Sequence, residues 1–111
     1  MARKVVTLRH LQCFATEDTS TDEIYLTVDG VRSWPQSGIF SMGGVAPREV
    51  PMHIEKVIPR NGVVTVKLFD EDSPDGDDEL GELVVRESDV GDLAFDFTRD
   101  EAHYRLSYNV E

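Results

Sequence analysis

The chain has 111 residues with 22 acidic and 11 basic side chains, which give a formal net charge of −11. This length allows one hydrophobic core and excludes a large multidomain architecture, so we expect a single domain over residues 1–111. The charge argues against a nucleic-acid partner, no apolar run is long enough for a transmembrane segment, and the single cysteine excludes an internal disulfide.

Apolar and polar residues alternate with a period of two along most of the chain, a pattern that predicts strands. In chain order, we expect strands at residues 4–14, 23–29, 31–34, 50–58, 63–69, 80–86, 94–98 and 103–110. The alternation slips at Arg9-His10 in the first strand, which predicts a β-bulge. We therefore expect an all-β fold, a single antiparallel β-sandwich of about eight strands.

Two dipeptides that are favoured in β-hairpins separate expected strands. Asp29-Gly30 follows the second strand, and Asn61-Gly62 precedes the fifth. Because neighbouring antiparallel strands alternate in direction, every second loop is expected at the same end of the sandwich. The loops at that end are 15–22, 35–49, 70–79 and 99–102. Segments far apart in the sequence are thus predicted to meet there.

Half of the acidic residues fall in two short segments that contain no basic residue. These eleven acids are Glu17, Asp18, Asp22, Glu23, Asp70, Glu71, Asp72, Asp75, Asp77, Asp78 and Glu79. The rest of the chain carries eleven acids and eleven bases and is neutral. Both acidic segments are expected at one end, where each close carboxylate pair costs about 1 kcal/mol even in water. Either a cation relieves this repulsion, or the segments are solvated loops without a ligand.

Calcium suits two irregular acidic loops best, because it takes six to eight oxygen ligands and tolerates variable geometry. Magnesium prefers a strict octahedron, and zinc or copper would require histidine and cysteine, which are scattered along this chain. An EF-hand is excluded. A loop that starts at Asp70 has Asp75 where the motif needs glycine and Gly81 where it needs glutamate.

The segment VTVKLFDEDSPDGDDELGELVV resembles the second half of a C2 domain, a calcium- and phospholipid-binding β-sandwich. In that family the third calcium loop has an aspartate at the end of a strand, another two residues on, and a third six residues further. Asp70, Asp72 and Asp78 have this spacing. The resemblance implies a C2-like fold in which these three aspartates are the core calcium ligands.

The first calcium loop of the family has a looser counterpart in TEDTSTDEIYLTV. The family carries two aspartates six residues apart, whereas the residue six before Asp22 is Thr16. Glu17 or Asp18 would instead pair with Asp22 or Glu23. The resemblance thus implies one or two calcium ions between loops 15–23 and 70–79. The candidate ligands are Asp70, Asp72, Asp78, Asp22, Asp18, Glu17, Glu23, Asp75 and Asp77, with Asp100 as a lesser candidate.

The sequence does not identify the lipid or protein partner that this domain would bind. Lipid-binding C2 domains usually carry a lysine-rich strand, whereas the basic residues here are few and dispersed. Ile39 and Phe40 in SGIFSMGG form either an apolar loop tip or part of the core in an irregular strand. The start, MARKVVTLRHLQCF, shows no signal-peptide pattern, and the compartment is also left open.

The sequence contains neither a nucleophile elbow nor a glycine-rich phosphate loop, so we expect a non-enzymatic binding module. Two other functions stay open. One is a metal-independent interaction module, or a subunit of a larger assembly, that docks a basic partner through the acidic end. The other is a calcium-assisted carbohydrate-binding module in which Trp34 or Tyr25 stacks on a sugar ring. Trp34 would otherwise cover the edge of the core.

Overall fold

The computed structural model describes residues 3–17, 20–71 and 76–111. The elements in this part of the chain are β1 (Val5–Ala15), β2 (Asp22–Val28), β3 (Val31–Trp34), β4 (Phe40–Met42), β5 (Glu49–Val57), β6 (Val63–Asp70), β7 (Asp78–Arg86), β8 (Gly91–Phe97), the 3-10 helix η1 (Arg99–Glu101) and β9 (His103–Val110). No helix among the described residues has the length and apolar character needed to cross a membrane.

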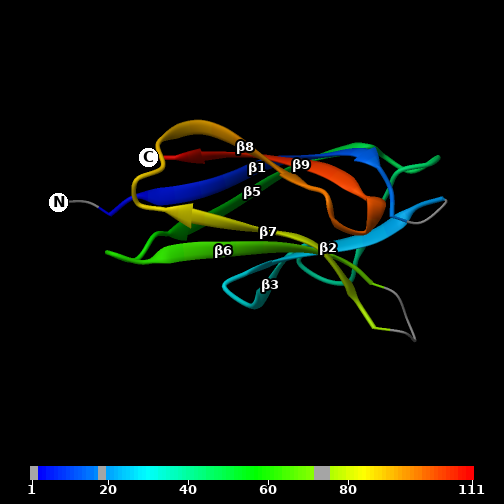
Figure 1. The fold of residues 1–111 in the computed structure, drawn as a ribbon, viewed down its shortest axis with the longest axis horizontal. Helices are drawn as coiled ribbons and strands as arrows, with labels where there is room; N and C mark the ends of the chain where they lie inside the picture. The colour runs from blue at the N-terminus through cyan, green and yellow to red at the C-terminus, as the bar shows by residue number, and fades with distance from the viewer. Residues whose placement is uncertain (1–2, 18–19, 72–75) are drawn as a thin grey trace.

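The strands form two antiparallel sheets that face each other as the layers of a sandwich (Figure 1). One sheet has the order β5-β1-β9-β8. The other has the order β3-β2-β6-β7, and β4 also pairs with β2. The predicted fold class, an antiparallel β-sandwich, is therefore confirmed.

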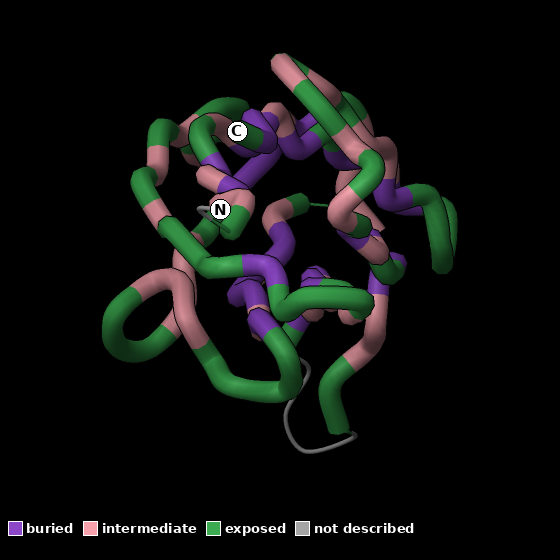
Figure 2. The backbone as a smooth tube through the Cα atoms, turned by 90° about the vertical axis from the view of Figure 1, so that its left-hand side faces the viewer, coloured by how far each residue is buried: buried purple, intermediate pink, exposed green. Residues whose placement is uncertain are grey.

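The alternating sequence pattern places one face of each strand in the core. On β9, for example, Tyr104 and Leu106 are fully buried and Tyr108 is 7% exposed. Figure 2 shows buried stretches of the backbone on both layers and exposed turns around the rim. Removing this apolar surface from water, at about 25 cal/mol per Å², is the main force that holds the two sheets together.

All eight expected strands are present, with ends displaced by a few residues. The structure adds β4, which the alternation does not predict because it is only three residues long. β3 pairs with the second half of β2, and β4 pairs with its first half. They are two parts of one interrupted edge strand, so the expected alternation of strand direction is preserved.

Two local predictions are confirmed. Asp29-Gly30 closes the hairpin between β2 and β3, and both residues adopt positive φ, 51° and 81°. Such angles fit the tight turn that this dipeptide favours. The register of β1 against both neighbouring strands shifts between Leu8 and His10, where the bulge was expected.

The expectation of a hairpin at Asn61-Gly62 is wrong, because β5 and β6 belong to different sheets. Asn61 has a φ of 58°, and the Gly62 N–H donates to the Pro59 carbonyl over 2.9 Å, so the dipeptide does form a tight turn. The turn lies within a crossing from one sheet to the other. Local turn chemistry fixes the reversal of the chain but does not specify which strands pair.

The expected loops meet at one end of the sandwich. A side chain at Gly43 would collide with Thr16, so the turn after β4 packs on the loop after β1. The Glu71 N–H donates to the Glu23 carbonyl over 2.7 Å, which joins the segment after β6 to β2. β1 begins and β9 ends at the opposite end (Figure 1).

Candidate metal centre

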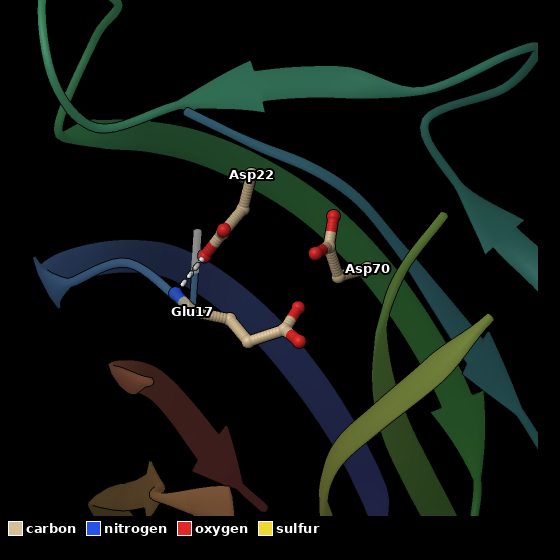
Figure 3. Close-up of side chains that lie close together, drawn as sticks. All are labelled: Glu17, Asp22 and Asp70. Atoms are coloured by element: carbon tan, nitrogen blue, oxygen red, sulfur yellow. Dashed lines mark hydrogen bonds between the residues drawn. The ribbon is translucent and has the colours of Figure 1, made fainter. Parts of the chain in front are cut away.

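Three carboxylates converge at this end of the sandwich: Glu17 from the loop after β1, Asp22 at the first position of β2, and Asp70 at the last position of β6 (Figure 3). One oxygen from each lies within 4.8 Å of the others. Two oxygens that are each about 2.4 Å from one calcium ion can be at most about 4.8 Å apart. The three side chains are therefore close enough to share an ion.

The strand pairing explains why Asp22 and Asp70 come together. β2 and β6 are antiparallel neighbours, and Ile24 is paired with Asp70. The start of β2 therefore lies beside the end of β6. Both aspartates are 0% exposed, which is unusual for charged side chains.

Hydrogen bonds hold the two buried aspartates in place. The Glu23 N–H donates to Asp70 Oδ1 over 2.8 Å. Asp22 Oδ2 accepts two hydrogen bonds, from the Glu17 N–H over 2.9 Å and from the Tyr104 hydroxyl over 2.7 Å. Each donor is supplied by a different segment, so the carboxylates are fixed by the fold as well as by their own strands.

The raised pKa of Glu17 reflects the electrostatic cost of bringing these carboxylates together. Hydrogen bonding of its protonated form to Asp70 and burial together raise the pKa of Glu17 from its ordinary 4.5 to about 9, and the nearby Asp78 contributes further. Glu17 Oε2 is buried, and no donor in the described part of the chain satisfies it. Without a cation, a proton bound to Glu17 near neutral pH reduces the repulsion among these carboxylates.

A second group of carboxylates shares Glu17 with the first. One oxygen each from Glu17, Asp78 and Asp100 lies within 4.8 Å of the others. Asp100 and Glu101, both in η1, have positive φ values of 55° and 65°. Residues other than glycine seldom adopt this conformation, which is found preferentially at functional sites. Here it accompanies a carboxylate that faces the centre.

The remaining candidate ligands are placed as follows. Asp77 accepts a hydrogen bond from the Tyr25 hydroxyl and belongs to neither group. Glu23 contributes its backbone N–H to Asp70, and its side chain is in neither group. Asp18, Asp72 and Asp75 lie outside the described residues.

Sequence reasoning missed the contribution of Tyr104. Its position in the alternating pattern of β9 marks it only as a core residue, and the sequence offers no sign that its hydroxyl reaches Asp22 on the other sheet. Asp100 was only a lesser candidate, because its distance in sequence from the acidic loops hides its place beside Asp78. Both features depend on how the two sheets are stacked.

The donor chemistry of the two groups fits calcium. All five side chains offer carboxylate oxygen, the ligand type that hard cations prefer. Neither group of described residues includes the histidine or cysteine that zinc and copper sites use. Two of the side chains are fully buried and positioned by hydrogen bonds, so the site is partly preformed.

The aromatic residues considered for sugar stacking are occupied within the protein. The Tyr25 ring stacks on Phe69 with 5.1 Å between ring centroids, and the Arg32 guanidinium lies 3.8 Å from its centre. Because β2 lies between β3 and β6, these two neighbours flank Tyr25. Trp34 is half-buried, packs against the core and contacts Phe40. Both aromatic residues thus have structural neighbours where a sugar would stack.

Comparison with solved structures shows which known fold this chain shares. A chain described as "Structure of a C2 domain" aligns with a TM-score of 0.56 and 14% sequence identity, over 99% of both chains. The protein therefore has a C2-like fold, as the resemblance of residues 64–85 implied. At this identity the likeness concerns the fold alone. No protein-family model and no curated protein sequence matches the chain.

Proposed function

We propose that this protein is a non-enzymatic binding module that holds calcium between the loops 15–23 and 70–79. The observation that carries the proposal is the convergence of Glu17, Asp22 and Asp70, whose oxygens lie within 4.8 Å of one another. The C2-like fold supports it, since the acidic loops lie at one end of such a sandwich. Bound calcium supplies positive charge to this end of the protein.

The ligands of the first ion would be Glu17, Asp22 and Asp70. A second ion would lie between Glu17, Asp78 and Asp100. Asp72 lies outside the described residues and remains a candidate ligand from its spacing in the sequence alone. Calcium is favoured over magnesium because carboxylates from separate loops can accommodate a variable number of oxygen ligands more readily than a strict octahedron.

Calcium binding would change what this end of the protein can contact. Without calcium, the excess of acidic over basic residues at this end repels anionic surfaces and attracts basic ones. One or two divalent ions would neutralise part of this charge and so make it easier for a membrane or protein partner to approach. A metal-independent module would instead dock a basic partner through the same carboxylates, and that interaction would weaken steeply with added salt.

Thermal unfolding with and without calcium tests the proposal. Ligand that binds only the folded state at 100 times its dissociation constant adds about 2.7 kcal/mol of stability. For a domain of about 100 residues this corresponds to a rise in melting temperature of roughly 10 °C. We expect such a rise when EDTA is replaced by about 5 mM calcium, and a much smaller one with equimolar magnesium.

Asp89→Asn provides a control that removes one negative charge far from the centre. The Asp89 carboxylate accepts the Arg86 N–H after β7, at the other end of the sandwich, and asparagine keeps an acceptor there. This variant should show the same calcium response as the wild type. Equal melting temperatures of the wild type in EDTA and in calcium would overturn the calcium proposal and favour the metal-independent module.

A further inference from the structure

Tyr104 connects the candidate metal centre to the core of the opposite sheet. It lies on β9, where it is paired with Cys13 of β1 and Phe97 of β8, all in one sheet. Its hydroxyl donates to Asp22 Oδ2 over 2.7 Å, and Asp22 begins β2 in the other sheet. The bond therefore crosses the sandwich directly beneath the acidic loops.

The environment of this bond makes it a strong constraint. Tyr104 and Asp22 are both 0% exposed, so water does not compete for either group. Hydrogen bonds to an ionised acceptor are shorter and about twice as strong as neutral ones. Burial, and next the hydrogen bond to Asp22, raise the pKa of the Tyr104 hydroxyl above its ordinary value.

The same oxygen of Asp22 also accepts the Glu17 N–H over 2.9 Å. Tyr104 thus fixes the carboxylate that in turn holds the backbone of Glu17, the residue common to both carboxylate groups. Displacement of Asp22 would shift two ligands at once. A group that orients a metal ligand in this way typically contributes about 10- to 100-fold to metal affinity.

We infer that Tyr104 is a positioning residue for the calcium centre: through its hydrogen bond to Asp22 it sets the geometry of the first carboxylate group. The inference rests on the proposed function and adds to it a residue of the hydrophobic core. It also makes calcium affinity depend on how the two sheets are stacked, because the donor and the ligand belong to different sheets.

Tyr104→Phe removes the hydroxyl and keeps the ring. We expect calcium affinity, measured by competition with a chromophoric chelator, to fall about 10- to 100-fold. Tyr108→Phe is the matched control. Tyr108 lies on the same face of the same strand, is 7% exposed, and is near Asp89 at the opposite end. Its affinity should equal that of the wild type, although the core loses one hydroxyl in each variant.

A double-mutant cycle separates positioning from a general loss of stability. If Tyr104 acts through Asp22, then Tyr104→Phe should cost less than about 2-fold in affinity when it is added to Asp22→Ala, which removes the acceptor of the Tyr104 hydroxyl. A loss of the same size in both backgrounds would contradict the inference. So would wild-type affinity in the single Tyr104→Phe variant. Failure of the wild type itself to bind calcium would overturn the proposed function instead.

A measurement on the protein without substitutions tests the inference even if the Tyr104→Phe variant does not fold. The chain has three tyrosines, so fluorotyrosine labelling gives three fluorine NMR signals that can be assigned readily. Calcium should shift the signal of Tyr104, because its acceptor becomes a metal ligand, and leave that of Tyr108 unchanged. A calcium-saturated protein with no shift at Tyr104 would contradict the inference.

Discussion

Asp70→Asn is expected to raise the melting temperature of the metal-free protein and to remove most of its response to calcium. Asp70 is fully buried and lies within 4.8 Å of two other carboxylates. Neutralising it removes a buried charge and its repulsion with the Asp22 carboxylate, which we expect to stabilise the metal-free fold by about 1–2 kcal/mol. Loss of a charged ligand should weaken calcium binding about 100-fold, or about 2.8 kcal/mol.

Asparagine is a conservative choice at this position. It retains a carbonyl oxygen for the Glu23 N–H, which donates to Asp70 Oδ1 over 2.8 Å. The opposite signs of the two effects make the prediction specific, because damage to the fold would lower stability in both conditions. Melting curves in EDTA and in calcium, with Asp89→Asn alongside, check it. A metal-free variant less stable than the wild type, or an intact calcium response, would contradict our account.

Calcium binding should become tighter as the pH rises through neutrality. Glu17 has its pKa raised to about 9, first by hydrogen bonding to Asp70 and then by burial, so near pH 7 the metal-free protein carries a proton there. A metal ligand must be deprotonated, so the first ion that binds displaces this proton. Affinity should rise by up to about 10-fold per pH unit between about pH 6 and pH 9.

The same proton gives the metal-free protein an opposite pH dependence. The pKa of Glu17 is higher in the folded state, about 9, than its ordinary value of 4.5, so the folded state binds more protons between these values. The stabilisation is complete below pH 4.5 and is lost as the pH rises to about 9. In EDTA, stability should therefore decline as the pH increases across this window.

Glu17→Gln tests the assignment of both pH effects. Glutamine cannot ionise, so the decline in metal-free stability should be smaller in this variant than in the wild type across the same pH range. Its residual calcium affinity should also depend less on pH. The two measurements are denaturant unfolding in EDTA and calcium titration at several pH values. Identical pH profiles for the variant and the wild type would place the titrating group elsewhere.

The sequence predicts the fold well because strands with one buried face carry a strong period-two signal. The loops at 15–22 and 70–79 could be assigned to one end from strand direction alone, and the structure brings Glu17, Asp22 and Asp70 together there. The two errors are local. β4 is too short to show periodicity, and the turn at Asn61-Gly62 joins two sheets instead of closing a hairpin.

The detailed membership of the centre is harder to predict than its location. A run of acids in one loop gives no indication of which side chains face inward: Asp78 faces the centre, whereas Asp77, its neighbour, bonds to Tyr25 on the outer face of the sheet. Likewise Tyr104 and Tyr108 have the same pattern in β9, yet the hydroxyl of Tyr104 is the one that reaches Asp22. These distinctions depend on side-chain direction and on the stacking of the sheets.

A crystal structure of the protein soaked in calcium, with anomalous data to identify the ion, tests the central claim most directly. Our account predicts a calcium ion about 2.3–2.6 Å from carboxylate oxygens of Glu17, Asp22 and Asp70. A fully calcium-exposed crystal with no ion between these three side chains, or with calcium bound only at another part of the surface, would contradict the account.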